Sequence, residues 1–146
     1  MSEKRILVVD DDPNDAELTL RALDRVSLRN AVDIARDGQE ALEYLERRGP
    51  FASRPAGDPA VVLMDVRMPR LGGIEALERI KANPSLRRIP VVMLTSSREE
   101  SDVLRSYELG SNAYVVKPVA FEEYLETISG LGEFWVRLNE PPPRAG

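Results

Sequence analysis

Five polar side chains of this 146-residue chain follow short apolar runs. They are three carboxylates, one hydroxyl and one ammonium, from Asp10, Asp11, Asp65, Thr95 and Lys117. If the apolar runs are parallel strands of one sheet, their carboxyl ends share an edge and these groups converge there. Carboxylates suit a hard divalent cation, while an ammonium and a hydroxyl can bind phosphoryl oxygens. The spacing therefore predicts a site that holds a divalent cation against a phosphoryl group.

An aspartate carboxylate can attack phosphorus to form an acyl phosphate if its own charge and the phosphoryl charge are neutralised. A cation held by Asp10 and Asp11 would neutralise part of that charge, and the side chains of Thr95 and Lys117 would bind phosphoryl oxygens. We interpret Asp65, whose strand is centrally placed, as the nucleophile.

The chain contains neither Cys nor His. This excludes disulfides, Ser-His and Cys-His nucleophiles and the usual zinc ligands, and it leaves Mg²⁺ or, as the alternative, Mn²⁺. A chain without His cannot supply its own phosphohistidine, so the phosphoryl group must come from a partner or a small molecule. The net charge of −5 argues against a nucleic-acid partner. With no long apolar segment near the N-terminus, we expect a soluble, cytoplasmic protein with no membrane partner.

Apolar, β-branched runs alternate with helical patterns, which predicts a parallel sheet in one domain. The expected strands are 6–9, 31–35, 61–64, 91–94 and 113–116, and the expected helices are 13–26, 38–48, 73–83, one between 97 and 110, and one from 121. Asp12 should cap the first helix, Ser97 and Glu100 should form a capping box, and Gly110 should end the fourth helix. We expect a surface loop over 49–59 and no helix over 140–146.

Four segments together resemble the receiver domain of two-component response regulators. They are Val8-Val9-Asp10-Asp11-Asp12-Pro13, Leu63-Met64-Asp65-Val66-Arg67-Met68-Pro69, Leu94-Thr95-Ser96 and Val116-Lys117-Pro118. The resemblance implies a flavodoxin-like α/β fold, with a doubly wound five-stranded parallel sheet of strand order 2-1-3-4-5. We expect residues 5–131 to form the receiver domain and residues 132–146 a C-terminal extension, with no output domain.

The resemblance also implies how the phosphoryl group and the metal are bound. Asp65 would be the phosphoacceptor, and Mg²⁺ would be bound by Asp11, Asp65 and the backbone carbonyl of Arg67, with Asp10 holding the metal chiefly through water. Lys117 would be the cation that binds the phosphoryl group.

Further residues are implied to respond to phosphorylation. Thr95 would be the switch hydroxyl and Tyr114 the aromatic switch residue, and the peptide bond before Pro118 would be cis. Arg67 and Ser97 occupy two places that flank the acyl phosphate in receivers and tune its hydrolysis. Our hypothesis is that Arg67 shields the phosphoryl group and lengthens its lifetime.

Within receivers, three features resemble the single-domain group that partners phytochrome-type sensor histidine kinases. They are the long loop before the Asp65 strand, the segment Leu104-Arg105-Ser106-Tyr107 and the ending Gly132-Glu133-Phe134-Trp135. This implies a homodimer through the fourth helix, fifth strand, fifth helix and C-terminal extension. The apolar patch would consist of Phe134, Trp135, Val136 and Leu138. The alternative for Trp135 is packing against its own domain.

Other functions fit the residues less well. An aspartyl-phosphate phosphatase or mutase carries an Asp-x-Asp motif after its first strand, whereas Asp10 here is followed directly by Asp11. A flavin or nucleotide carrier would need a Gly-rich or hydroxyl-rich phosphate loop at that place. A receiver used as an adaptor without phosphorylation stays open. Taken singly, the first aspartates also fit an acidic helix start, and Asp65 fits a turn. We predict a signalling protein that acts by protein-protein interaction, not a turnover enzyme.

Overall fold

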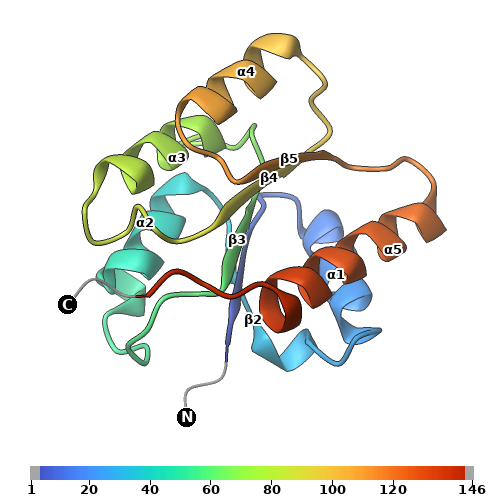
Figure 1. Ribbon diagram of the computed structural model, residues 1–146, viewed down its shortest axis with the longest axis horizontal. Coiled ribbons are helices and arrows are strands. Elements are labelled where there is room, and N and C mark those ends of the chain that lie inside the picture. Colours follow the sequence, from blue (N-terminus) through green and yellow to red (C-terminus); the bar gives the residue numbers. More distant parts are fainter. Residues whose placement is uncertain (1–3, 144–146) are drawn as a thin grey trace.

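The computed structural model describes residues 4–143 and contains one five-stranded parallel sheet with helices on both faces (Figure 1). The strands hydrogen-bond in the order β2-β1-β3-β4-β5, and every neighbouring pair is parallel. This order confirms the predicted doubly wound, flavodoxin-like fold. The strands are β1 Ile6–Val9, β2 Val32–Ala35, β3 Val61–Met64, β4 Val91–Thr95 and β5 Ala113–Val116.

Two helices cover one face of the sheet and three cover the other (Figure 1). Helices α1 (Pro13–Asp24) and α5 (Phe121–Gly132) pack against each other on the first face. Helices α2 (Gly38–Glu46), α3 (Gly73–Ala82) and α4 (Glu100–Glu108) lie in succession on the second. Short 3₁₀ turns η1 (Arg29–Ala31) and η2 (Gly49–Phe51) and a π-helical segment η3 (Glu133–Leu138) complete the described structure.

The core has two layers because side chains alternate across the sheet. In β1, Leu7 and Val9 point into the layer under α2 and α3, while Ile6 and Val8 point into the layer under α1 and α5. All residues of β1, β3 and β4 are buried, as expected for strands covered on both faces.

Several predicted helix ends are confirmed and one is wrong. Asp12 caps α1 by accepting a hydrogen bond from the amide of Asn14, and Gly110 follows α4 with a positive φ of 98°. The capping box at Ser97 does not form. Helix α4 begins at Glu100 with Glu99 as its N-cap and no side-chain cap, and Ser97 lies ahead of the helix, where its hydroxyl donates to the carboxylate of Asp102. In a capping box the hydroxyl accepts from the amide three residues on, which requires a helix that starts directly after Ser97, and α4 starts two residues later.

The first residues after 131 stay packed on the domain. Segment η3 continues from α5, and Val136 lies in the core layer under α1 and α5. Residues 140–143 form no helix, as predicted, and the end of the predicted tail, 144–146, lies outside the described residues. The 49–59 loop also follows the prediction, with the Arg54 guanidinium 4.2 Å from the ring centroid of Tyr44.

Asp37 provides a test of how α2 is anchored. Its buried carboxylate accepts hydrogen bonds from the Glu40 amide at 2.9 Å and from Nε of Arg70 at 2.7 Å. We expect Asp37→Ala to lower the free energy of unfolding by about 1–2 kcal/mol at neutral pH, because the N-cap is lost. Urea denaturation measures this difference.

The same experiment should depend on pH in one direction. Burial alone would raise the pKa of Asp37, but the hydrogen bonds from Arg70 and the Glu40 amide outweigh burial and lower it. A carboxyl group whose pKa is lower in the folded state than in the unfolded state stabilises the folded protein. This stabilisation is complete above the pKa of the unfolded state and is lost as the pH falls through the pKa of the folded state. The difference in the free energy of unfolding between wild type and Asp37→Ala should therefore become smaller below about pH 4. A gap that widens on acidification would contradict this role.

Candidate functional site

The predicted anchors lie at or just after the carboxyl ends of β1, β3, β4 and β5, which share one edge of the parallel sheet. The backbone hydrogen bonds of the sheet continue one residue past three of the strands and fix Asp10, Asp65 and Lys117. The amide of Asp10 donates to Ala35, that of Asp65 to Val9, and that of Lys117 to Thr95, at 3.0, 3.0 and 2.8 Å. The positions of these side chains therefore follow from strand pairing itself.

Lys117 is the centre of the charge arrangement. Its Nζ lies 2.9 Å from Oδ2 of Asp10 and 3.3 Å from Oδ2 of Asp65. The side chains of Lys117 and Asp10 are each 5% exposed. Burial alone would lower the Lys117 pKa, but the charges of Asp10 and Asp65 outweigh burial and raise it above its ordinary value. Lys117 is thus a fixed ammonium that offsets the charge beside Asp65.

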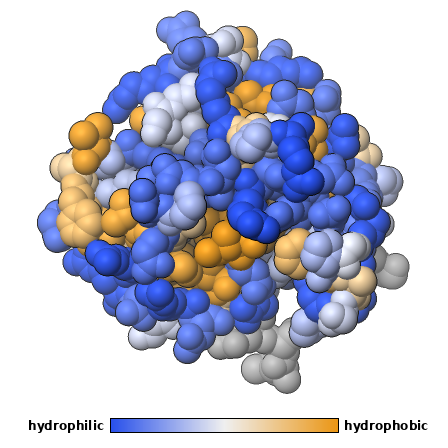
Figure 2. Space-filling view, turned by 180° about the vertical axis from the view of Figure 1, so that it is seen from behind, coloured by the Kyte–Doolittle hydropathy of each residue, from blue (hydrophilic) through white to orange (hydrophobic). Residues whose placement is uncertain are grey.

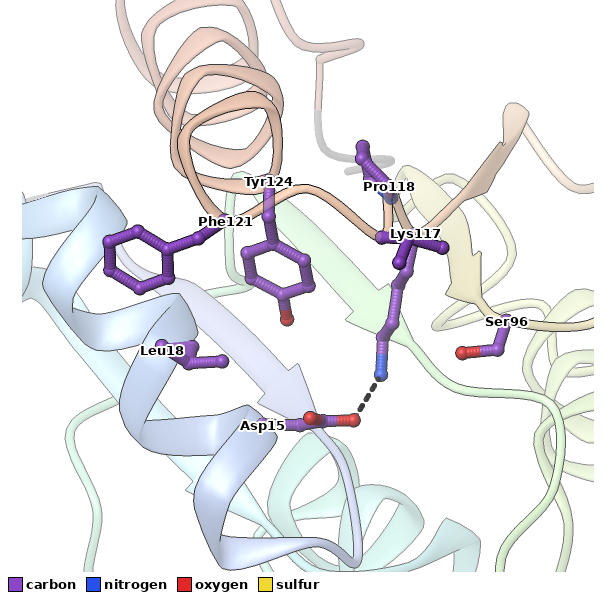
Figure 3. Close-up of a pocket in the computed structure, with 8 residues that line it drawn as sticks. Asp15, Leu18, Ser96, Lys117, Pro118, Phe121 and Tyr124 are labelled. Carbon is purple, nitrogen blue, oxygen red and sulfur yellow. Dashed lines mark hydrogen bonds and ion pairs between the residues drawn. The ribbon is translucent and has the colours of Figure 1, made fainter.

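Asp15 is a third carboxylate at Lys117 that the sequence did not reveal as a site residue. It lies in the first turn of α1, with Oδ2 3.1 Å from Nζ of Lys117 (Figure 3). Both residues border a cavity of about 250 Å³ between α1 and the β5-α5 connection. The cavity is lined by Asp15, Leu18, Ser96, Lys117, Pro118, Val119, Phe121 and Tyr124. In the sequence, Asp15 reads only as an acidic residue at a helix start.

Asp10, Asp11 and Asp65 form a set that fits a divalent cation. Each offers one carboxylate oxygen, and these oxygens all lie within 4.8 Å of one another. Asp10 is buried while Asp11 is exposed, so the set opens to solvent on one side. An all-oxygen donor set suits Mg²⁺ or Mn²⁺ better than zinc, which prefers nitrogen and sulfur.

The backbone at Asp65 is held tightly by its surroundings. Oδ1 of Asp65 accepts the amide of Val66 at 2.7 Å, and the amide of Gly73 donates to the carbonyl of Val66 at 2.9 Å. A Cβ atom added at Gly73 would overlap the carbonyl oxygen of Asp65. Gly73 therefore lets the start of α3 pack directly on the backbone of Asp65.

The two predicted switch residues, Thr95 and Tyr114, both contact Ser97. The buried Oγ1 of Thr95 accepts the Ser97 amide at 3.3 Å, and the hydroxyl of Tyr114 donates to the Ser97 carbonyl at 3.0 Å. Within residues 4–143, Thr95 makes no hydrogen bond to Asp65. Thr95 and Asp65 instead border one open cavity of about 460 Å³.

The two predicted tuning residues, Arg67 and Ser97, meet at Asp102. Nη2 of Arg67 lies 2.9 Å from Oδ2 of Asp102, and Oγ of Ser97 donates to the same oxygen at 2.7 Å. Arg67 also pairs with Glu99 at 3.2 Å. This role of Asp102 was not predicted from the sequence, because Asp102 lies in the first turn of α4, where an acidic residue is common.

The predicted cis peptide before Pro118 is wrong. No cis peptide bond occurs among residues 4–143, so the bond between Lys117 and Pro118 is trans. The trans form of such a bond is favoured by about 0.5–1 kcal/mol unless tertiary contacts override it, and the sequence does not encode those contacts locally.

The predicted interface residues fall into two groups. Phe134 and Leu138 are 46% and 74% exposed, and Leu104, Tyr107, Val119 and Phe121 are also exposed elsewhere. Trp135 is half-buried against the α1/α5 layer, which supports packing on its own domain, and its ring meets that of Phe134 edge to face. Val136 is core and not patch, so that part of the prediction is wrong. Figure 2 shows separate apolar areas on a mostly hydrophilic face.

No helix in the described part of the chain is long and apolar enough to cross a membrane. Comparison with known protein families matches residues 6–129 to the response regulator receiver domain. Response regulator Rcp1 from Synechocystis sp. is 37% identical over 139 residues, which cover 95% of this chain and 93% of Rcp1.

Solved structures give the same relationship. A phosphorylated cyanobacterial phytochrome response regulator, RcpA, matches with a TM-score of 0.89 at 34% identity. The match covers 97% of this chain and 100% of the RcpA chain. The bacteriophytochrome response regulator RtBRR is 56% identical, with a TM-score of 0.76, and the match covers 97% of this chain and 86% of the RtBRR chain. The Mn²⁺-bound form of Rcp1 has a TM-score of 0.87 at 36% identity, and the match covers 96% of this chain and 99% of the Rcp1 chain.

Proposed function

Because this chain belongs to the family of response regulator receiver domains, we propose that it accepts a phosphoryl group on Asp65 and signals by protein-protein interaction. The observation that carries this proposal is the buried Lys117 ammonium, which contacts both Asp10 and Asp65 at the carboxyl edge of the sheet. That contact offsets the charge that would otherwise repel a phosphoryl donor from Asp65. The protein would receive one phosphoryl group per signalling cycle instead of turning over a substrate.

The proposed donor is a phosphohistidine of a sensor histidine kinase, since this chain has no His. A carboxylate oxygen of Asp65 forms the new bond to phosphorus, the bond from phosphorus to the donor nitrogen breaks, and its electron pair stays on that nitrogen. Lys117 and Thr95 bind the phosphoryl oxygens. The phytochrome response regulators among the relatives support a phytochrome-type kinase as the partner. A cytoplasmic location stays a prediction.

The proposed cofactor is Mg²⁺, with Mn²⁺ as an alternative supported by the Mn²⁺-bound Rcp1 structure. Asp10, Asp11, Asp65 and the backbone carbonyl of Arg67 would hold it. When bound, a divalent cation neutralises the carboxylates and the phosphoryl oxygens. The chain itself orients Asp65 through the Val66 amide and positions the Lys117 ammonium beside it.

Phosphorylation would be relayed through Ser97. If Thr95 turns toward a phosphoryl oxygen, its contact with the Ser97 amide is lost, and Tyr114 holds the carbonyl of that same residue. The segment before α4 and the Tyr114 ring would then change their packing together. This amounts to a shift between two arrangements of α4 and β5.

The central test is covalent phosphorylation. Incubation with Mg²⁺ and acetyl phosphate should give an acid-stable, base-labile adduct of one phosphoryl group, detected by intact-protein mass spectrometry. Asp65→Asn should abolish it, because the amide is a poor nucleophile. Asp12→Asn is a matched control, since Asp12 is exposed and Asn caps a helix equally well. A wild-type protein without an adduct would favour the phosphorylation-independent adaptor.

We also propose a homodimer through α4, β5, α5 and the residues after 131. The exposed Leu104 and Tyr107 on α4 and the exposed Phe134 and Leu138 in η3 support such a surface. Multi-angle light scattering should give a dimeric mass, and Leu138→Glu should shift it toward the monomer. Because Leu138 is 74% exposed, this variant should fold normally. A monomeric wild type at high concentration contradicts the dimer.

A further inference from the structure

Asp102 connects two chain segments that border the cavity at Asp65. Its Oδ2 binds the guanidinium of Arg67, from the β3-α3 connection, and the hydroxyl of Ser97, from the β4-α4 connection. The Asp102 side chain is 15% exposed, whereas those of Arg67 and Glu99 are 64% and 66% exposed. An ion pair as exposed as that of Arg67 and Glu99 contributes little, so Asp102 is the partner that fixes Arg67.

These contacts hold the Arg67 guanidinium on acidic side chains at the start of α4. The cavity of about 460 Å³ over Asp65 is bordered by Arg67, Thr95 and Ser97, among others. Within residues 4–143, the ion pairs of the Arg67 guanidinium are with Glu99 and Asp102, both at the start of α4. Asp102 therefore engages the guanidinium of Arg67 at the border of the cavity that contains Asp65.

We propose that Asp102 is a positioning residue that shortens the lifetime of the phosphoryl group by withholding Arg67 from it. The inference rests on the proposed phosphorylation of Asp65. A phosphoryl group carries a charge of about −1.5 to −2 and strong acceptor oxygens, so it competes with the Asp102 carboxylate for the guanidinium. Whichever acceptor holds Arg67 decides whether the phosphoryl group is shielded.

Hydrolysis is the step that this competition controls. The oxygen of a water molecule bonds to phosphorus, the bond from phosphorus to the Asp65 oxygen breaks, and its electron pair restores the carboxylate. Inorganic phosphate leaves, and one proton is released to solvent. A guanidinium over the phosphoryl oxygens obstructs the incoming water, whereas a guanidinium held by Asp102 leaves its path open.

The competing explanation is that Asp102 only stabilises the first turn of α4 through the helix dipole. That role predicts a change in stability and no change in the rate of phosphate loss. It also predicts that the effect of Asp102 is the same whether or not Arg67 is present. The two explanations therefore differ in a kinetic measurement.

The test follows loss of the adduct with time after acetyl phosphate is removed, with Mg²⁺ present throughout. Asp102→Asn should lose phosphate roughly three- to ten-fold more slowly, and Arg67→Gln should lose it faster by a similar factor. The double variant should decay at the rate of Arg67→Gln, because Asp102 acts through Arg67. The control is Glu78→Gln, which breaks the exposed ion pair of Arg105 with Glu78 between α3 and α4 and should leave the rate unchanged.

The inference is overturned if Asp102→Asn decays at the wild-type rate, or is slowed equally in the absence of Arg67. Arg67→Gln is a second, independent test. Because the Arg67 side chain is exposed, this variant should fold normally. Loss of its phosphoryl group no faster than in wild type would overturn the inference. Urea denaturation of each variant separates these effects from lost stability. Absence of any adduct on wild-type protein would instead overturn the proposed function.

Discussion

Replacing Lys117 with Met is expected to lower the free energy of unfolding by about 3 kcal/mol and to prevent the phosphoryl adduct from accumulating. The 5%-exposed carboxylate of Asp10 would lose its buried cation, and Asp65 and Asp15 would lose the same partner. Removing one member of a buried ion pair is costly because it leaves the other charge desolvated and uncompensated. The adduct is lost because no ammonium remains to bind the phosphoryl oxygens.

Urea denaturation in EDTA and mass spectrometry with acetyl phosphate measure the two effects separately. The double variant with Asp10→Asn should recover part of the stability, since it removes the uncompensated charge, but it should not recover the adduct. Lys81→Met is the matched control, because the Lys81 ammonium binds the backbone carbonyls of Arg87 and Ile89 instead of the carboxylates of the site. Its free energy of unfolding should fall by roughly 1–3 kcal/mol, and it should still form the phosphoryl adduct. A Lys117→Met protein as stable as wild type would contradict the charge argument.

The anchors of the site could be predicted from sequence because their positions depend on strand pairing. Once 6–9, 61–64 and 113–116 are parallel strands, the residues after them must meet at one edge. The structure shows how strand pairing positions these residues, because the amides of Asp10, Asp65 and Lys117 each continue the hydrogen bonding to the adjacent strand. The alternation of buried side chains likewise follows from the period of two residues in a strand.

Asp15 and Asp102 could not be found in the same way. Each lies in the first turn of a helix, where an acidic residue needs no explanation beyond the helix dipole. Their partners lie far along the chain, with Lys117 at a separation of 102 residues from Asp15 and Arg67 at 35 from Asp102. Whether such an acid reaches a cation depends on how helices and loops approach each other, and no local pattern encodes that approach.

The errors have the same origin. Ser97 and Glu100 have the spacing of a capping box, but α4 starts at Glu100, two residues later than that box requires. Val136 lies in a run of apolar residues that fits either an exposed patch or a core face. The course of η3 after α5 turns Val136 inward and leaves Leu138 outside. Local propensity restricts these alternatives, and tertiary contact selects among them.

Gly73 offers a second large effect, this one on backbone geometry. A Cβ atom at this position would overlap the carbonyl oxygen of Asp65 and also approach the Asp65 carbonyl carbon and the side chain of Met64. Because the nearest atoms belong to the backbone, Gly73→Ala can be accommodated only if Asp65 or the start of α3 moves. We expect a loss of about 3 kcal/mol in the free energy of unfolding, the upper part of the range for overpacked sites.

The displaced backbone should also slow phosphorylation by acetyl phosphate, since the carboxylate of Asp65 moves relative to Lys117. Gly130→Ala is the control, because an added Cβ there meets no atom within 4 Å. Gly130 lies within α5, so this variant should gain about 0.5–1 kcal/mol from the lower backbone entropy of Ala in the unfolded chain and keep the wild-type rate. If Gly73→Ala behaves like Gly130→Ala in both measurements, the close packing of α3 on Asp65 does not constrain the site.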